Sequence, residues 1–567
     1  MPSRFDYVRA FCLTVSLAAL VPANPKVPVR AKHGMVVAQE PIAADVGLSV
    51  LKSGGNAVDA AVAVGFALAV THPSAGNIGG GGFMLVRLAS GQSEFLDFRE
   101  CAPQKASRDM YIGADGKATR DSIFGWRSVG VPGSVAGFEI ASKKFGSKPW
   151  ADLVAPAVKL ARDGFPVSAT LANSLQSTKS LAEDPESKRI FLRHGNPYQP
   201  GDTIRQPELA ATLERIATLG AKGFYQGETA QKFAAAMAAH GGLITEADLK
   251  DYKVLQRKPL TGDYRGFEII TAPPPSAGGI GLLQIMGILR GANYESDGAD
   301  SPKAVHFEAE AMRRFYADRS EYLGDADFYN VPVRALLDPA YLARRRQSID
   351  PYHATPSDLV EPGLPRTAAA HAFPPESPQT THYNVIDGTG NAVTVTYTLN
   401  NSYGNGITVP GLGFLLNDEM DDFAAQPGVP NMFGLMGGDA NAIEPGKRPL
   451  SSMTPTIIAK NGQIVMAVGA PGGSRITTGV TEVILDVLDF HMNAQDAVDL
   501  PRFHEQWKPD FLYLQKGFPP QTVEALQKMG YQIKPVDGVA RVEVIVKDGD
   551  TLEGGTESRL NGKVAGY

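Results

Sequence analysis

Residues 380–398 read TTHYNVIDGTGNAVTVTYT, and this stretch decides the fold. Two runs rich in β-branched and aromatic residues, 381–387 and 392–398, flank a Gly/Asn turn at 388–391, which predicts a β-hairpin. The preceding residues 351–378 are rich in Pro, Ser, Thr and Ala with little periodicity, which predicts a mobile surface segment. A loose loop is therefore expected to deliver the chain to a threonine that begins a strand.

Thr380 stands where an enzyme with an N-terminal nucleophile places its catalytic residue. A threonine hydroxyl alone is a weak nucleophile. Cleavage of the Gln379–Thr380 bond would free an α-amine with a pKa of about 7.7–8.0, which can act as the base. The same residue would then supply nucleophile and base. The pattern alone leaves open the alternative that Thr380 is an ordinary threonine at a strand start.

Residues 1–23 have the features of a secretory signal peptide. Arg4 and Arg9 precede an uncharged apolar run at 10–21, and residues 21–23 (VPA) form a small-residue cleavage pattern. The apolar run is too short to cross a bilayer, which takes about twenty residues. The alternative is a buried or disordered N-terminal segment.

The composition is that of an ordinary globular enzyme. The 567 residues are 43% hydrophobic and 20% charged, with a net charge of -6 and no Lys/Arg cluster that offers a phosphate-binding stripe, which argues against disorder, a multi-spanning membrane protein and nucleic-acid binding. Length alone predicts roughly four domain-sized units. Signal cleavage would remove Cys12 and leave Cys101, which is expected to be inert. His382 and His504 occur singly, so they are expected to be structural hydrogen-bonders, and no metal site or cofactor is predicted.

Several further elements can be predicted from periodicity. Residues 41–51 and 56–70 predict two helices, the second of them buried. Four glycines at 79–82 lead into a strand at 83–88. A phosphate-binding loop is the alternative there, but no Gly-Lys-Ser/Thr follows, so close packing is the expected role of these glycines. Residues 301–321 predict a covering helix with one apolar face and charges on the opposite side.

Motifs spread along the chain resemble those of the gamma-glutamyltransferase (gamma-glutamyltranspeptidase) family. They are QTTHY at 379–383 with Asp387, VTYTLN at 395–400, DFRE at 97–100, VPGS at 131–134, YADRS at 316–320, LNDEMDDF at 416–423, KRPLSSM at 447–453 and PGGSR at 471–475. The resemblance covers nearly all of the chain after the signal peptide. Several long motifs in the right order argue against a chance match.

The resemblance implies a zymogen that cuts itself before Thr380. Residues 1–23 would be the signal peptide, 24–379 a large subunit and 380–567 a small subunit that carries the nucleophile. The two pieces would stay together as one heterodimer, and thus one composite domain. The implied fold class is α/β (α+β), a four-layer αββα sandwich of the N-terminal nucleophile hydrolase type, with strands from both pieces.

The resemblance also implies the site residues. The catalytic group is Thr380, with Thr398 to orient it and the backbone N–H groups of Gly472 and Gly473 as an oxyanion hole. The residues implied to bind a glutamyl substrate are Arg99, Ser451 and Ser452 for its α-carboxylate, and Asn400, Glu419 and Asp422 for its ammonium group. Without the resemblance, Thr398 would be an ordinary strand threonine, the glycine pair a turn, and residues 418–422 a solvated acidic turn.

One departure from the family concerns the segment 427–438, which resembles the lid loop of bacterial members. Phe433 stands where a tyrosine is common. A phenylalanine ring can still cover a pocket, but it cannot hydrogen-bond to Asn400. We therefore expect a lid that is held less firmly. The ratio of hydrolysis to transfer in the wild type and in Phe433→Tyr tests this, and equal ratios would refute it.

Three functions stay open from the sequence. The first is a γ-glutamyl transferase and hydrolase that acts on glutathione and related γ-glutamyl amides, with water, amino acids or peptides as acceptors. The second is a glutaryl-type (cephalosporin) acylase of the same fold, and the third is a non-catalytic secreted binding protein. Asp422 favours the first, because a glutaryl group lacks the ammonium that this carboxylate would pair with. No cofactor, nucleic acid or membrane anchor after signal removal is expected, and the location is expected to be periplasmic or secreted.

Overall fold

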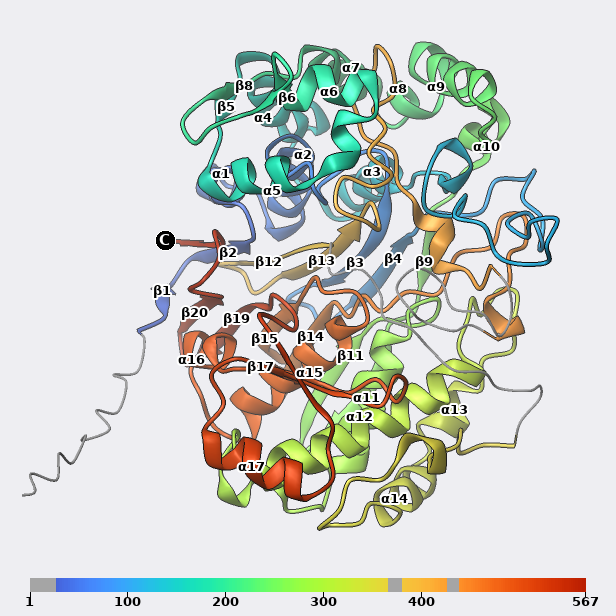
Figure 1. Cartoon of the computed structure of the whole chain (residues 1–567). Coiled ribbons are helices and arrows are strands. Elements are labelled where there is room, and N and C mark those ends of the chain that lie inside the picture. The colour runs from blue at the N-terminus through green and yellow to red at the C-terminus, as the bar shows by residue number, and fades with distance from the viewer. Residues whose placement is uncertain (1–26, 366–379, 426–437) are drawn as a thin grey trace, which may run out of the picture.

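The computed structural model describes residues 27–365, 380–425 and 438–567. Within these residues two seven-stranded sheets lie face to face, and helices cover the outer face of each (Figure 1). This is the predicted four-layer αββα sandwich. The pairing of neighbouring strands in both sheets is antiparallel throughout.

The first sheet contains the predicted hairpin at its centre. Its strands, in spatial order, are β21 (Lys563–Gly566), β2 (Gly34–Ala38), β12 (Thr381–Asp387), β13 (Ala392–Thr398), β3 (Gly81–Arg87), β4 (Ser93–Phe98) and β9 (Leu255–Arg257). The hairpin strands β12 and β13 have the predicted bounds. They insert between β2 and β3, which come from the part of the chain before Thr380.

The second sheet also mixes strands from before and after Thr380. Its order is β1 (Val29–Ala31), β20 (Thr551–Thr556), β19 (Glu543–Asp548), β15 (Gln463–Gly469), β14 (Thr456–Lys460), β11 (Phe267–Thr271) and β10 (Leu260–Tyr264). Smaller sheets join β16 (Phe503–His504), β17 (Leu512–Gln515) and β18 (Ile533–Val536), β5 (Phe165–Pro166) with β8 (Thr203–Ile204), and β6 (Leu192–Arg193) with β7 (Asn196–Pro197). Because each large sheet contains strands from both parts, neither part could complete these sheets alone.

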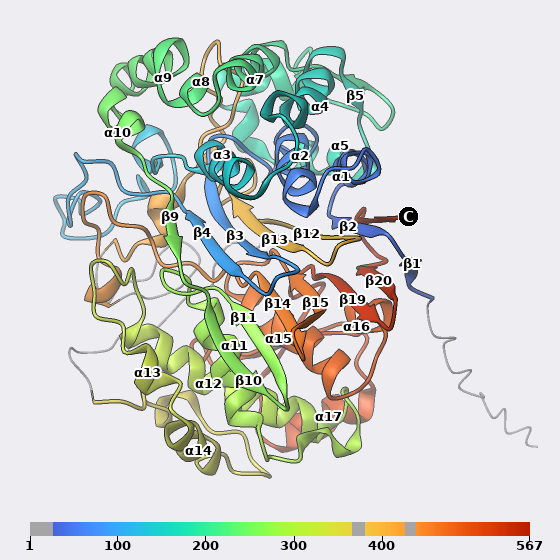
Figure 2. The same ribbon diagram turned by 180° about the vertical axis from the view of Figure 1, so that it is seen from behind.

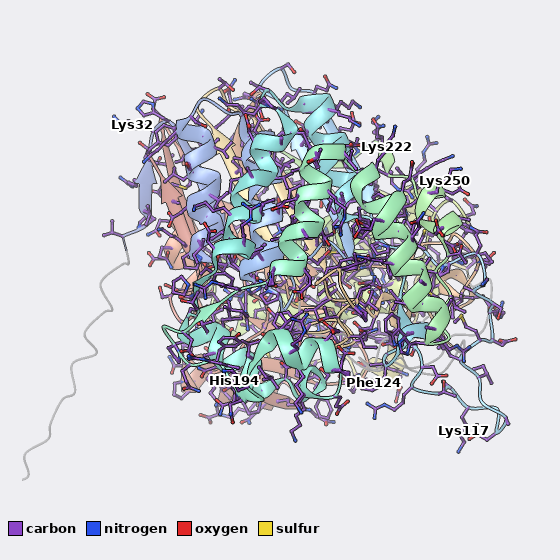
Figure 3. The ribbon with its side chains drawn as sticks, turned by 90° about the horizontal axis from the view of Figure 1, so that it is seen from above. Lys32, Lys117, Phe124, His194, Lys222 and Lys250 are labelled. Carbon is purple, nitrogen blue, oxygen red and sulfur yellow. The ribbon has the colours of Figure 1, made fainter. Side chains whose placement is uncertain are left out.

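One helical layer covers the hairpin sheet, as the view from above shows (Figure 3). It comprises α1 (Pro41–Lys52), α2 (Ala57–Thr71), α3 (Ser134–Phe145), α4 (Trp150–Asp163), α5 (Ala169–Ser177), α6 (Pro185–Phe191), α7 (Pro207–Leu219), α8 (Lys222–Tyr225), α9 (Gly227–Ala239) and α10 (Glu246–Asp251). The two helices predicted after residue 40 are confirmed. Asn56 caps α2 in a capping box with Asp59, and every residue of α2 is buried.

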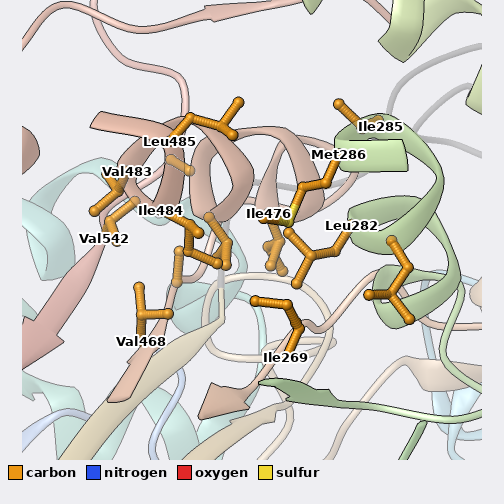
Figure 4. Close-up of a cluster of buried hydrophobic side chains, with 14 of the residues drawn as sticks. Ile269, Leu282, Ile285, Met286, Val468, Ile476, Val483, Ile484, Leu485 and Val542 are labelled. Atoms are coloured by element: carbon orange, nitrogen blue, oxygen red, sulfur yellow. The ribbon is translucent and has the colours of Figure 1, made fainter. Parts of the chain in front are cut away.

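The other helical layer packs on the second sheet (Figure 2). It comprises α11 (Gly278–Leu289), α12 (Pro302–Tyr322), α13 (Val333–Leu336), α14 (Pro339–Gln347), α15 (Arg475–Leu488), α16 (Ala494–Asp499) and α17 (Pro520–Lys528). Figure 4 shows apolar side chains of α11 and α15 packed together over this sheet, among them Met286 and Ile484. None of the helices in the described ranges is long and apolar enough to cross a membrane.

The covering helix predicted at 301–321 is present as α12. The charges opposite its apolar face do not point into water, because all of its charged residues except Lys303 are buried. The structure pairs them instead: Arg314 contacts the carboxylate of Glu310 at 2.6 Å, and Asp318 lies 3.3 Å from Arg345 of α14. Periodicity did not reveal this because residues distant in sequence cover the polar side of the helix.

The four glycines at 79–82 have the packing role that was predicted. A Cβ atom on Gly80 would lie 2.1 Å from the carbonyl oxygen of Thr398, and one on Gly82 would lie 2.3 Å from that of Thr396. Only a residue without a side chain allows β3 to approach β13 this closely. The glycines therefore fix the position of the strand that ends in Thr398.

Candidate active site

A narrow pocket at the head of β12 gathers the predicted site residues, with the exception of Gly472. It is lined by Arg99, Thr380, Thr398, Asn400, Glu419, Asp422, Ser451, Ser452, Met453, Gly473 and Ile476. Its volume is about 20 Å³. This is room for about one water molecule, because the side chains of the pocket contact one another.

Thr380 and Thr398 are placed by the hairpin. The last pair of the β12–β13 ladder is Thr381 with Tyr397, so the same register sets Thr380 opposite Thr398. The Thr398 hydroxyl accepts a hydrogen bond from the Asn400 N–H at 2.9 Å, and its carbonyl accepts one from Asn77 Nδ2 at 2.8 Å. Thr380 is 8% exposed. The register and these bonds hold two hydroxyl groups at one end of the sandwich.

Asn400 adopts a backbone conformation that few residues tolerate. Its φ is 75°, in the left-handed region that asparagine enters more readily than most side chains. Asn400 Nδ2 donates to the carbonyl oxygen of Asp418 at 2.9 Å. This contact ties the end of the hairpin to the acidic segment 418–422.

Arg99 lies at the centre of the charged part of the pocket. It directly follows β4 and is 1% exposed. Its guanidinium forms ion pairs with Glu419 and, at 2.5 Å, with Asp422, and it also donates to the Leu450 carbonyl oxygen at 3.3 Å. The resemblance implied that Arg99 binds one end of a ligand and that Glu419 and Asp422 bind the other end. In the structure these side chains contact each other.

The charges around Arg99 are unbalanced. Glu419 and Asp422 pair with it, and Glu100 Oε2 lies 3.9 Å away. Burial raises the pKa of Glu100 to about 7, with Arg99 acting against the shift, and burial raises the pKa of Glu419 as well. Burial lowers the pKa of Arg99, but these carboxylates outweigh it and raise that pKa overall. Since one guanidinium cannot neutralise three carboxylates, two of them buried, the cluster retains a proton near neutral pH.

Arg99 is held in place by residues that were not among the predicted site residues. Its N–H donates to Asp97 Oδ1 at 3.1 Å, and its carbonyl oxygen accepts from the Tyr252 hydroxyl at 2.9 Å. Asp97 is itself held by Arg257 and Arg448, each at 2.7 Å. Asp97 belongs to the DFRE motif and Arg448 to the KRPLSSM motif, so the motifs could have indicated both residues. Tyr252 lies outside every motif.

Ser451 and Ser452 form another wall of the pocket. The Ser451 N–H donates to the carbonyl oxygen of Pro275 at 3.0 Å, and its hydroxyl accepts from the Met453 N–H at 3.1 Å. Arg319 Nη2 lies 3.5 Å from Ser452 Oγ. These contacts fix the backbone of both serines beside the Arg99 guanidinium.

The glycine pair links β15 to α15. Gly472 has φ 145° and Gly473 has φ 60°, and only glycine adopts this pair of conformations at low cost. Gly473 lines the pocket and its carbonyl oxygen accepts from Ile476 N at 3.1 Å, whereas Gly472 lies against Ala540. The start of α15 thus faces the pocket with the partial positive charge of a helix N-terminus.

Other predictions can be compared with the structure in the same way. Burial lowers the pKa of His382 and of His504 to about 3, and both rings hydrogen-bond to neighbouring side chains, as a structural role requires. Cys101 is a free cysteine, and burial raises the pKa of its thiol to about 12, which agrees with the predicted inertness. The described ranges contain no group of acidic, His and Cys side chains suited to a metal ion. Gln379 and Phe433 lie outside the described residues.

The four-layer fold, with Thr380 at the head of an inner strand, defines the class of N-terminal nucleophile hydrolases. The sequence profile of the gamma-glutamyltranspeptidase family matches residues 43–567, and the chain belongs to this family.

Known proteins support that assignment. The chain is 47% identical over 545 residues to the glutathione hydrolase proenzyme of Escherichia coli (strain K12), covering 95% of this chain and 93% of that protein. The structure of gamma-glutamyltranspeptidase from Helicobacter pylori aligns with 62% of this chain and 99% of its own, at 44% identity and a TM-score of 0.58. The structure of cephalosporin acylase from Bacillus halodurans aligns over 98% of this chain and 99% of its own, at 29% identity and a TM-score of 0.84.

Proposed function

We propose that the protein is a γ-glutamyl transferase and glutathione hydrolase that works through a γ-glutamyl ester on Thr380. The observation that carries the proposal is the pocket in which Thr380 lies with Arg99, Glu419 and Asp422. A nucleophile beside one buried cation and paired anions suits a substrate that carries its own carboxylate and ammonium next to the reacting amide.

The zwitterionic end of the substrate would exchange partners within the pocket. The α-carboxylate of the glutamyl group binds the Arg99 guanidinium, and the Ser451 and Ser452 hydroxyl groups donate hydrogen bonds to it. The ammonium of the glutamyl group binds Glu419, Asp422 and the side chain of Asn400. Because Arg99 already contacts both acidic residues, each charge of the substrate replaces part of an existing ion pair. The net charge of the pocket does not change on binding, because this end of the substrate carries one charge of each sign.

The reaction then proceeds in two steps, acylation and deacylation, and both take place at Thr380 Oγ. Thr380 Oγ attacks the γ-carbonyl carbon while its proton passes to the free α-amine of Thr380, and the N–H groups of Gly472 and Gly473 bind the tetrahedral oxygen. Collapse breaks the amide bond, and the leaving amine takes the proton. Water, an amino acid or a peptide then attacks the ester and releases Thr380. Thr398 orients the nucleophile throughout.

The free α-amine requires maturation. Attack of Thr380 Oγ on the carbonyl carbon of Gln379 moves the acyl group from nitrogen to oxygen, and water opens the resulting ester. Residues 24–379 and 380–567 become the two subunits. Removal of residues 1–23 as a signal peptide places the heterodimer in the periplasm or outside the cell.

A cephalosporin-type acylase is the second candidate, favoured by the likeness to the Bacillus halodurans acylase. Asp422→Asn separates the two. Its effect on γ-glutamyl-p-nitroanilide hydrolysis should be severe, since the substrate ammonium loses a charged partner, whereas glutaryl-p-nitroanilide, which has no ammonium, should lose little. Equal losses on both substrates would contradict the assignment of Asp422.

The non-catalytic alternative is tested with Thr380→Ala. We expect the wild type to run as two chains on a denaturing gel and to release p-nitroaniline from γ-glutamyl-p-nitroanilide. The variant should run as one chain and release none. A wild type that is unprocessed and inactive would refute the enzymatic function.

A further inference from the structure

A second cavity lies beside the nucleophile strand and shares no lining residue with the Arg99 pocket. Its volume is about 410 Å³, within the usual range of about 300–1,000 Å³ for small-molecule sites. Its walls come from the end of β2, the end of α2, α5, the start of β19 and residues 560–562. Figures 1 and 2 both show α5 and the C-terminal end of the chain near β2.

The floor of this cavity contains polar groups whose bonding capacity is unused. Gln39 is 8% exposed, and neither its Oε1 nor its Nε2 has a hydrogen-bond partner among the described residues. Glu543 is 2% exposed, and its Oε2 also lacks a partner there. Leaving a buried polar group unpaired is unfavourable. A ligand with hydrogen-bond donors would satisfy the Gln39 oxygen and the Glu543 carboxyl oxygen together.

The neighbouring Glu40 adds a second acidic group at the floor. Its Oε2 accepts hydrogen bonds from the Ala43 N–H at 2.9 Å and from Thr71 Oγ1 at 2.7 Å, which fix the carboxyl group in place. His72, which also lines the cavity, has its pKa lowered to about 4 by burial and by Arg541, so it is neutral near pH 7. Burial raises the pKa of Glu40 and of Glu543, so the floor presents carboxyl oxygens as hydrogen-bond acceptors, without a competing histidine cation.

Arg541 supplies a positive charge at the edge of the same cavity. Its side chain is exposed and forms no ion pair with a carboxylate of the described ranges. Its backbone N–H donates to the Pro471 carbonyl oxygen at 3.2 Å, which fixes Arg541 beside the segment that leads into Gly472. An exposed guanidinium at the edge of a cavity whose floor offers carboxyl and amide oxygens suits a ligand that has an anion at one end and an amine at the other.

We propose that this cavity is a second binding site, specific for a small zwitterion such as a free α-amino acid or a dipeptide. The ammonium group of the ligand lies on Gln39 Oε1 and Glu543 Oε2, and its carboxylate lies on Arg541. Gln39 directly follows β2, whose last pair with β12 joins Ala38 to Tyr383. The bound ligand thus sits next to the strand that begins after Thr380. The site depends only on the cavity and stands whether or not Thr380 is a nucleophile.

Calorimetric titration of the purified protein with glycylglycine tests the proposal. We expect saturable binding with a Kd near or below about 1 mM, which a titration to about 10 mM would reveal. N-acetyl-glycylglycine lacks the ammonium and glycylglycinamide lacks the carboxylate. Each should bind about tenfold or more weakly, the effect of losing one charge-assisted hydrogen bond.

Variants then locate the site. Arg541→Gln and Gln39→Leu should each weaken glycylglycine binding about tenfold or more. Arg334→Gln, which changes an exposed arginine on α13, and Asp422→Asn, which alters the other pocket, should leave the Kd within about twofold. Thermal unfolding midpoints identify any variant that is misfolded, and the exposed position of Arg541 makes its variant the safest readout.

Two results would overturn the proposal. One is the absence of saturable binding to the wild type. The other is binding that is lost in Asp422→Asn but kept in Arg541→Gln, which would place the dipeptide in the Arg99 pocket. Failure of the catalytic proposal would look different, because p-nitroaniline release would be absent while glycylglycine binding and its dependence on Arg541 persisted.

Discussion

Replacement of Arg99 by lysine tests how the pocket recognises a carboxylate. Lysine keeps the positive charge but presents one compact ammonium in place of a planar fork. In the structure the two terminal nitrogens of Arg99 contact different carboxylates, and Nη2 also donates to the Leu450 carbonyl oxygen. A lysine can satisfy only part of this set. Alanine would be a poorer test, because removing one partner of a buried ion pair typically destabilises a protein by about 3–5 kcal/mol.

The expected magnitude follows from the lost contacts. One hydrogen bond to a charged group contributes about 1.5–3 kcal/mol, or roughly a 10- to 150-fold change in an equilibrium. We expect kcat/KM for γ-glutamyl-p-nitroanilide to fall by a factor in this range. The loss should be mainly in KM, since the α-carboxylate is bound alike in ground and transition states.

Steady-state kinetics measure the change, with Arg314→Lys as the matched control. Arg314 is as buried as Arg99 and also pairs with a carboxylate, but it lies on α12, away from the pocket. Its variant should lose stability without a change in KM. A change in kcat/KM of less than about threefold for Arg99→Lys, or a loss confined to kcat, would refute the proposed contact between Arg99 and the substrate.

Two further predictions concern the surroundings of the pocket. Gly80→Ala should lower activity and cost about 1–3 kcal/mol of stability, because the added Cβ would meet the Thr398 carbonyl oxygen. Gly538→Ala is the control, because open space surrounds Gly538, and it should be nearly neutral. Chemical denaturation and activity assays measure both variants. The raised pKa of Glu100, about 7 in the folded protein against a reference of 4.5, means that its contribution to stability is present below pH 4.5 and is lost as the pH rises through 7. Unfolding midpoints measured across this interval should fall less steeply in Glu100→Gln than in the wild type, and identical slopes would contradict the assignment.

The sequence predicted the parts of the fold that depend on local pattern. The hairpin strands have the predicted bounds because their alternation and their Gly/Asn turn are encoded within 381–398. The motifs also named most residues of the pocket. Local pattern could not show that Arg99 contacts Asp422, since these residues are 323 positions apart and meet only in the folded chain.

Tertiary packing also explains where local reasoning failed. The periodicity of 301–321 showed charges opposite an apolar face but not that they are buried, because amphipathic periodicity does not distinguish water from a second layer of ion-pairing side chains. The cavity floored by Gln39 and Glu543 had no sequence signal, because β2 and β19 belong to different sheets and are distant in sequence.

The central claim is that Thr380 becomes the first residue of a separate chain and carries the acyl group. Intact-mass analysis of the purified protein, before and after a brief incubation with a γ-glutamyl substrate and acid quench, tests both parts in one experiment. We predict a smaller chain that comprises residues 380–567, and a fraction of it heavier by one γ-glutamyl group, located on Thr380 by peptide mapping. A single uncut chain, a different first residue, or an acyl group on another side chain would contradict the account.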